Sequence, residues 1–383
     1  MRDIAIAKPF LDSSESEAVL RVLKSGWISS GPVCEAFEKK LAGFVGVRFA
    51  KAVNSGTSAI QLALLACEIK PGDEVIVPAF TCVAALNPIE HIGAHPVLVD
   101  IELDTFSMDP DLLVRKFSTK TKAVAVGHLF GLPAPMDRIM NAVRRHRIKI
   151  IEDAALGLGG RISGRNAGSF GEAAVLSFHP RKIITTGEGG MVLTNSPEIN
   201  SKVAALRSYG ASVQAWKRHH KRLFDLPQYE KAGFNYKLSD ILAAVGLEQA
   251  KKLGAMIKRR RVIASRYDKA FSDIPWLAIP SVPDECEHAY QSYVCLLKAS
   301  DPDVLSRKRS RLFSHLKAKG ISSVQGAQSM AEIAFFRRKY GWRPEAFPKA
   351  LLADRGTLAL PIYPSLSESD QERVIKAVLS FRF

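Results

Sequence analysis

The chain has 383 residues, of which 47% are hydrophobic and 24% are charged, an ordinary globular composition with room for a large core and two domains. No apolar run is long enough to span a membrane, and the first residues lack the apolar stretch of a secretory signal. The five cysteines are scattered and form no C-x-x-C pair, which favours a reduced, cytoplasmic protein without a metal site.

The formal net charge of +16 suggests an anionic partner. The basic residues lie in short clusters at 144–147, 258–261 and 307–309, each typical of the polar face of a helix. The sequence has no basic tail, no aromatic RNA-binding motif and no zinc-finger spacing. Solvated helix faces are therefore favoured over nucleic-acid binding.

The first 45 residues predict two helices. Ser13 and Ser14 can cap a helix over residues 13–24. A loop of turn-forming residues at 26–32 separates it from a second helix at 33–45, whose apolar residues recur at helical spacing.

Residues 53–65 predict a buried helix with an anion site at its start. Gly56 lets the backbone approach closely, and Thr57 and Ser58 open a helix that is apolar nearly all round. Free amides at a helix start, flanked by hydroxyls, suit a phosphate monoester. A plain helix cap is the alternative, and a Walker A loop is excluded because the G-K-[ST] ending is missing.

Apolar strands then alternate with helical patterns. This alternation predicts an α/β fold with a mostly parallel, doubly wound sheet, which binds ligands at the carboxyl ends of its strands. The expected strands cover residues 74–77, 96–99, 123–126 and 148–151, and the expected helices between them include 84–92 and 136–146.

Asp153 closes one of these strands. A carboxylate at the mouth of a buried strand needs a cationic partner or strong hydrogen-bond donors. A protonated pyridine nitrogen would serve, and helix capping by Asp153 is the alternative.

Lys182 lies between apolar strands at 173–176 and 191–194 and precedes a glycine-rich turn at 187–190. A lysine that its surroundings desolvate loses proton affinity and becomes an amine nucleophile. A Schiff base with an aldehyde cofactor requires such an amine. A surface charge is the alternative for this stretch taken alone.

The remaining residues predict a basic loop and a smaller α+β domain. The loop at 210–233 could cover an active site and meet a diphosphate, or be a surface loop. We expect residues 1–250 to form an N-terminal arm and a large domain, and residues 251–383 a small domain. The expected elements are helices at 241–253, 258–267, 307–319 and 368–379, and strands at 290–297 and 358–361.

Taken together, these motifs resemble the PLP-dependent enzymes of aspartate-aminotransferase fold (fold type I), and more narrowly the DegT/DnrJ/StrS-type sugar aminotransferases. The resemblance covers nearly the whole chain. It rests on GWISSGP at 26–32, NSGTSA at 54–59, PGDEVIVPAFT at 71–81, HLFG at 128–131, EDAA at 152–155, SFHPRK at 177–182, TTGEGGM at 185–191, GFNY at 233–236 and LPIYP at 360–364.

The resemblance implies the roles of the central residues. Lys182 would hold pyridoxal 5'-phosphate (PLP) as the internal aldimine and move the proton between substrate and cofactor carbons. Asp153 would pair with the pyridinium nitrogen and keep the ring an electron sink. The usual cycle takes an amino group from glutamate, stores it as pyridoxamine phosphate (PMP), and gives it to a keto group of a nucleotide-linked deoxysugar. Such sugars typically feed cell-surface polysaccharides or glycosylated natural products.

The resemblance also implies how the cofactor phosphate is held. Gly56, Thr57, Ser58 and Ser177 would bind it. In this family an asparagine at the position of Asn235 reaches the phosphate from the second subunit, which implies a homodimer with shared active sites.

Three features depart from the family pattern. Leu156 stands where the family usually has His or Gln bonded to the cofactor's phenolic oxygen, and it can neither donate nor accept. Cys82 falls where an aromatic residue commonly stacks on the pyridine ring. Residues 320–342 lack the usual His-Tyr substrate motif.

Two other functions stay open. The family's dehydratase branch replaces the lysine at position 182 with histidine, so the lysine favours the aminotransferase over a PLP- or PMP-dependent nucleotide-sugar dehydratase. Leu156 and Cys82 motivate a PLP-binding protein that has lost transamination and serves regulation.

Overall fold

The computed structural model describes residues 3–211, 228–229 and 231–382. Its centre is a seven-stranded sheet with strand order β1-β10-β9-β6-β5-β2-β4. The strands from β9 to β4 pair in parallel, whereas β10 and β1 pair antiparallel with their neighbours, so the predicted mostly parallel α/β sheet is confirmed. The strands are β1 (Phe49–Val53), β2 (Glu74–Pro78), β4 (His95–Val99), β5 (Thr121–Gly127), β6 (Lys149–Asp153), β9 (Ala173–Ser177) and β10 (Gly190–Thr194).

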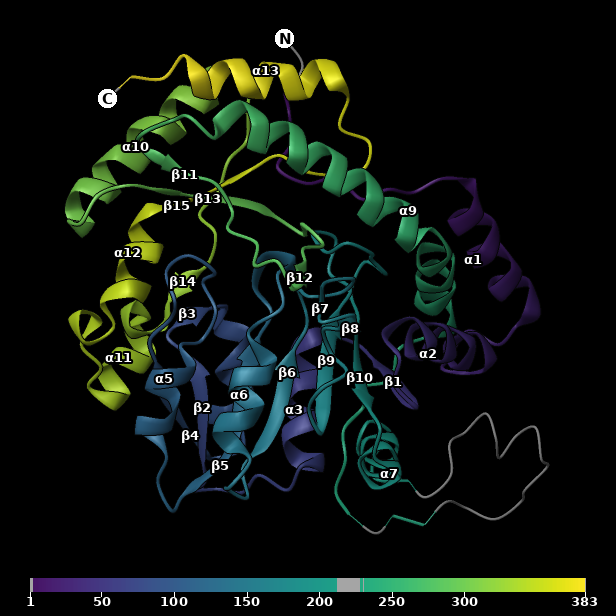
Figure 1. Cartoon of the computed structure of the whole chain (residues 1–383). Helices are drawn as coiled ribbons and strands as arrows, with labels where there is room; N and C mark the ends of the chain where they lie inside the picture. Colours follow the sequence, from purple (N-terminus) through teal and green to yellow (C-terminus); the bar gives the residue numbers. More distant parts are fainter. Residues whose placement is uncertain (1–2, 212–227, 230, 383) are drawn as a thin grey trace.

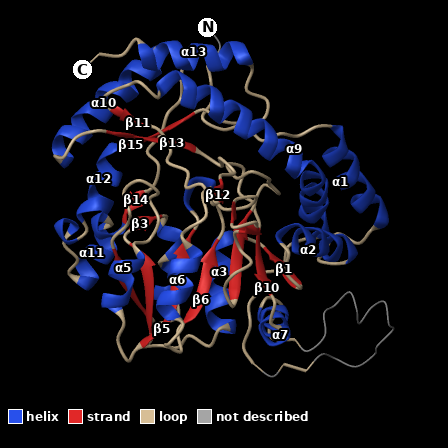
Figure 2. Ribbon diagram, viewed as in Figure 1, coloured by secondary structure: helices blue, strands red, loops and turns tan. Residues whose placement is uncertain are grey.

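Helices cover both faces of this sheet (Figures 1 and 2). Successive side chains of a strand point to opposite faces, and in β5 they join different cores. Val124 and Val126 pack with α5 and α6 on one face, and Ala123 and Ala125 pack with α3 on the other. The helices of this part are α1 (Ser13–Ser25), α2 (Pro32–Val45), α3 (Gly56–Ala66), α4 (Asn87–His91), α5 (Pro110–Leu113), α6 (Met136–Val143) and α7 (Pro197–Leu206).

One helix of 32 residues, α9 (Asp240–Phe271), leads from this part to the C-terminal part. The sequence predicts a helix at 241–253 and a long connecting helix that carries residues 258–267; the break between them is wrong, because one helix continues through Gly254. A glycine weakens a helix interior by about 1 kcal/mol, but Leu253 and Met256 are buried on either side of it. The predicted domain boundary between residues 250 and 251 falls inside α9, and the division into domains stays a prediction.

The C-terminal part contains a three-stranded antiparallel sheet, β11-β13-β15. α10, α13 and the second half of α9 pack against it around a separate core. β14 pairs with β3, which follows β2 of the large sheet, in a separate two-stranded sheet that also joins the two parts. The strands are β3 (Phe80–Thr81), β11 (Leu277–Ala278), β13 (Tyr293–Leu297), β14 (Gln328–Ser329) and β15 (Thr357–Leu360). The helices are α10 (Pro302–Ala318), α11 (Ala334–Tyr340), α12 (Pro348–Gly356) and α13 (Glu368–Leu379). A further small sheet consists of β7 (Arg161–Ile162), β8 (Arg165–Asn166) and β12 (Cys286–Glu287).

Two further observations concern the predicted elements. The strand expected at 290–297 begins only at Tyr293, because residues 288–292 form a turn in which Tyr290 has a φ of 50°. No helix within the described ranges has both the length and the apolar character needed to cross a membrane.

A buried ion pair joins α2, β1 and the end of α7. The guanidinium of Arg207 lies 2.5 Å from the carboxylate of Glu38, and both side chains are at most 5% exposed. Arg207 also donates to the carbonyl of Ala52 at 2.6 Å, and Lys51 lies 3.1 Å from Glu38. Burial alone would raise the pKa of Glu38, but the charges of Arg207 and Lys51 outweigh it and lower that pKa.

We expect Arg207→Met to lower the free energy of unfolding by about 3–5 kcal/mol, because it leaves a buried carboxylate without its closest cation. Urea unfolding measures this loss. The double variant Glu38→Gln/Arg207→Met is the control, and it should recover part of the stability because no buried charge is left unpaired. A double variant whose loss in the free energy of unfolding equals the sum of the losses of the two single variants would contradict this account.

Candidate active site

Four neighbouring strands bring the candidate residues to one edge of the sheet. Asp153 ends β6 and Ser177 ends β9, and these two strands are parallel neighbours. His128 follows the last residue of β5, which pairs with Asp153. Cys82 follows β3, directly after β2. Because the carboxyl ends of parallel strands meet at one edge, the predicted ligand edge contains all of these positions.

Lys182 lies in the turn between β9 and β10. The turn is closed by main-chain bonds from the Lys182 amide to the His179 carbonyl and from the Thr186 amide to the Phe178 carbonyl, at 2.8 and 3.1 Å. Burial lowers the pKa of the Lys182 amine, and the charges of Asp153 and Cys82 oppose that shift. Within the described part of the chain this amine has no hydrogen-bond or ion-pair partner, so it can act as a neutral nucleophile.

The carboxyl of Asp153 is short of donors. Burial raises its pKa, while the Ala155 amide, which donates at 3.1 Å, and the charge of Lys182 act against this shift. No other donor to this carboxyl occurs among the described residues. A charged donor such as a protonated pyridine nitrogen would therefore fit the remaining acceptor positions.

Glu152 points to the opposite face of β6 from Asp153 and is fully buried. Its carboxylate accepts from the amides of Gly168, Phe170 and Gly171 at 2.6–2.8 Å. The His128 ring nitrogen Nε2 lies 2.8 Å from it.

His128 is held in one tautomer. Its Nδ1 accepts from the Ala134 amide at 3.0 Å, so Nε2 carries the proton and donates to Glu152. This buried pair fixes the ends of β5 and β6 beside Asp153. Sequence reasoning did not identify the pair, although a glutamate inside an apolar strand is a signal that could have found it.

The start of α3 forms the predicted anion cradle. Ser55 caps the helix by accepting from the Ser58 amide at 3.1 Å, and the hydroxyls of Ser55 and Ser58 are 2.8 Å apart. A Cβ atom at Gly56 would lie only 2.9 Å from the Ser177 Cβ, so only glycine lets Ser177 reach the helix start. The first amides of a helix lack partners within it. The Gly56 and Thr57 amides, with the hydroxyls of Thr57 and Ser177, therefore offer donors to a phosphate.

The other predicted site residues are less enclosed. Cys82 is exposed, and its charge contributes to the pKa of Lys182. Asn235 is exposed, and its side-chain oxygen accepts from the Lys237 ammonium at 2.6 Å. Leu156 is half-buried against the main core. Most of the loop predicted at 210–233 lies outside the described residues.

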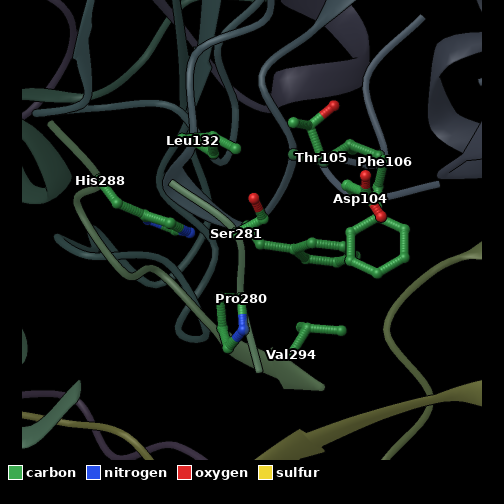
Figure 3. A pocket seen from close by; sticks show the side chains of 10 residues that line it. Asp104, Thr105, Phe106, Leu132, Pro280, Ser281, His288 and Val294 are labelled. Atoms are coloured by element: carbon green, nitrogen blue, oxygen red, sulfur yellow. The ribbon is translucent and has the colours of Figure 1, made fainter. Parts of the chain in front are cut away.

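A small cavity lies near this edge, between the turn at 129–132 and the C-terminal part. Figure 3 shows the imidazole of His288 and the side chain of Ser281 among its lining residues. Burial and the charge of Arg261 lower the pKa of His288 to about 3, so the ring is neutral. The cavity measures about 10 Å³, far below the roughly 300 Å³ of a small-molecule pocket. It is therefore not a substrate site.

The comparisons with known proteins agree with this geometry. The model of the DegT/DnrJ/EryC1/StrS aminotransferase family matches residues 9–379. The spore coat polysaccharide biosynthesis protein SpsC of Bacillus subtilis is 38% identical over 371 residues, which are 97% of this chain and 95% of that protein.

Two solved structures are also similar. Spr1654 of Streptococcus pneumoniae in its PMP form is 27% identical, with a TM-score of 0.91 and 98% of each chain covered, and its PLP form has a TM-score of 0.90. Helicobacter pylori PseC, an aminotransferase involved in the biosynthesis of pseudoaminic acid, is 26% identical, with a TM-score of 0.90 and 99% of this chain and 98% of that chain covered. The chain therefore belongs to the DegT/DnrJ/EryC1/StrS aminotransferase family, has its type I fold, and is a PLP-dependent sugar aminotransferase.

Proposed function

We propose that the chain moves an amino group from glutamate to a keto group of a nucleotide-linked keto-deoxysugar. The observation that carries the proposal is the amine of Lys182, which has no partner among the residues that the structure describes and whose pKa burial lowers, at the same sheet edge as Asp153 and the start of α3. When bound, PLP acts as an electron sink that makes the carbon carrying the amino group acidic. The residues described below hold it and move the proton.

The proposed roles follow from the surroundings of each residue. Lys182 would supply the amine that holds the cofactor and would move the proton. Asp153 would accept from the pyridine nitrogen and keep it protonated. Cys82 would face the ring, as a smaller side chain than an aromatic one.

The phosphate is held by the start of α3. The amides of Gly56 and Thr57 and the hydroxyls of Thr57 and Ser177 would donate to it, and Ser58, whose amide donates to Ser55, would complete the helix start. We also propose that Asn235, which is exposed in the single chain, reaches the phosphate bound by a second copy. The working enzyme would then be a homodimer with shared active sites.

The nucleotide-linked substrate is supported by charge and by the relatives. A chain with a net charge of +16 attracts a doubly charged diphosphate. SpsC is named for polysaccharide biosynthesis, and we propose a similar place for this chain, in the cytoplasm. A nucleotide-sugar dehydratase is the second candidate, although the lysine at position 182 favours the aminotransferase. A non-catalytic PLP-binding regulator, which Leu156 and Cys82 motivate, is the third.

The absorbance spectrum of the purified protein tests the first half of this reaction. We expect a visible band of the lysine-bound cofactor that glutamate converts to the near-ultraviolet band of PMP. The variant Lys182→Ala should lack the visible band because no other amine joins the cofactor. A visible band that ignores glutamate would contradict the proposed donor, and absence of any band after PLP is added would contradict the assignment of Lys182.

We expect Asp153→Asn to stabilise the cofactor-free protein while it weakens catalysis. The folded pKa of Asp153 is raised above 3.8 by burial, so the folded state holds its proton more tightly than the unfolded chain. The free energy of unfolding of the wild type therefore falls as pH rises from the pKa of Asp153 in the unfolded chain to its pKa in the folded state. Asparagine has no proton to lose, so the variant avoids this loss. Thermal melts across pH should show the variant above the wild type by a few degrees near neutral pH, with the gap closing in acid. A wild type that stays more stable near neutral pH would refute the argument.

We expect Leu156→Gln to lower the pH at which the visible band titrates. The negative charge of the cofactor's phenolic oxygen helps to hold the proton on the Lys182 nitrogen. A hydrogen bond from the glutamine amide to this oxygen would weaken that attraction, so the proton would leave at a lower pH. A spectrophotometric pH titration of the two proteins measures the midpoints, and Leu156→Met is the control that adds no donor. Equal midpoints for wild type and Leu156→Gln would show that residue 156 does not reach this oxygen.

A further inference from the structure

The turn at 288–292, which precedes β13, is held tightly against the turn that follows β5. The Ala289 amide donates to the Gly131 carbonyl at 2.9 Å, and the Ser292 amide donates to the Phe130 carbonyl at 3.1 Å. A Cβ atom at Gly131 would lie 2.8 Å from the main-chain nitrogens of Tyr290 and Gln291, so the two turns are in close contact. Tyr290 adopts the left-handed region, with its amide bonded to the His288 ring at 2.8 Å. Such a conformation persists only where the surroundings hold it.

Arg260 of α9 holds the same turn from the other side. Its Nη1 donates to the carbonyls of Tyr290, Gln291 and Ile362 at 3.0–3.2 Å. The side chain is 2% exposed, and burial lowers its pKa to about 10. No carboxylate pairs with it in the described part of the chain. A buried cation that depends on three carbonyls fixes their positions, because any displacement leaves the charge uncompensated.

From this fixed turn the side chain of Gln291 reaches the lysine turn. Its Nε2 donates to the Arg181 carbonyl at 2.7 Å, and its Oε1 accepts from the Ser292 hydroxyl at 2.9 Å. The Lys182 amide of the same peptide bond donates to the His179 carbonyl at 2.8 Å. Both polar groups of the peptide that carries Lys182 are therefore held, one from within the turn and one from the C-terminal part.

We propose that Gln291 is a positioning residue for the Lys182 amine. Through it, the turn at 288–292 and Arg260 set the orientation of the peptide between Arg181 and Lys182. Rotation of that peptide would move the Lys182 side chain relative to Asp153 and toward water. This inference rests on the proposed function of Lys182, and its importance follows from the sensitivity of catalysis to displacements of about 1 Å.

The first test uses cofactor-free protein. The variant Gln291→Met keeps the length of the side chain but removes the donor, and Ser292→Ala is the matched control that leaves the Nε2 donor in place. Acetylation of Lys182 by acetic anhydride across pH, followed by peptide mass spectrometry, measures the titration midpoint of the amine. We expect Gln291→Met to raise the midpoint because the amine gains contact with water, and Ser292→Ala to leave it near the wild-type value. An unchanged midpoint in Gln291→Met, or an equal shift in Ser292→Ala, would overturn the inference.

The second test uses the variant Gln291→Glu. A protonated carboxyl can donate to the Arg181 carbonyl, whereas an ionised one can only accept. Protection of the Lys182 amide from hydrogen exchange, corrected for the intrinsic rate, should therefore approach the wild-type value in acid and fall as pH rises. Gln291→Met should show low protection throughout. A Gln291→Glu variant without recovery in acid would contradict a donor role.

The third test uses the PLP-loaded protein. Gln291→Met should react with glutamate on the order of tenfold more slowly, with the affinity for PLP nearly unchanged. An unaltered rate would overturn the inference. The two cofactor-free tests need neither amino donor nor sugar, so they test the role of Gln291 even if the wild type does not use glutamate. Conversion of the PLP-loaded wild type to its PMP form by glutamate tests the proposed function separately.

Discussion

The amine of Lys182 beside the carboxyl of Asp153 is the constraint on which the site depends. Burial lowers the pKa of the first group and raises that of the second. Their mutual attraction opposes both shifts but does not cancel either of them. In the cofactor-free protein burial thus disfavours the charged form of each group. PLP would fit this pair, because it would take the amine into a covalent bond and offer the carboxylate a cationic donor.

Buried charged groups elsewhere in the described part of the chain have more hydrogen-bond partners than Lys182 and Asp153 have. The Glu152 carboxylate accepts from three amides and from His128. The Asp240 carboxylate accepts from three amides at the start of α2, and the Arg260 guanidinium donates to three carbonyls. Asp153, by contrast, accepts from one amide among the described residues. Asp153 therefore has acceptor positions left for a ligand, whereas the carboxylates of Glu152 and Asp240 and the Nη1 of Arg260 are bound to the main chain of the surrounding structure.

The parts of the site with local signals could be predicted from the sequence. Asp153 and Ser177 end apolar strands, and Gly56 opens an apolar helix, so a short stretch marks each of them. The bond from Gln291 to Arg181 joins residues 110 positions apart, and no local pattern contains it. Packing rather than propensity carries α9 through Gly254. The sequence predicts a strand that begins at Tyr290, a residue type common in strands, but the main-chain groups of residues 290–292 bind the turn at 129–131 and Arg260 instead of extending β13.

The C-terminal part approaches the sheet edge through two separate segments. The turn at 288–292 holds the lysine peptide through Gln291. The segment at 325–330 belongs to the stretch 320–342, in which the sequence predicts a departure from the family's His-Tyr motif. It pairs through β14 with β3 and so lies beside the residues that lead to Cys82. It is anchored by Asp354, which accepts from the Gln325 side chain at 2.9 Å and from the Ser329 amide at 2.8 Å. Because the two segments use different anchors, side chains at 325–330 can change without disturbing the peptide that carries Lys182. This separation would let the stretch 320–342 differ in sequence while the contacts of the peptide that carries Lys182 stay the same.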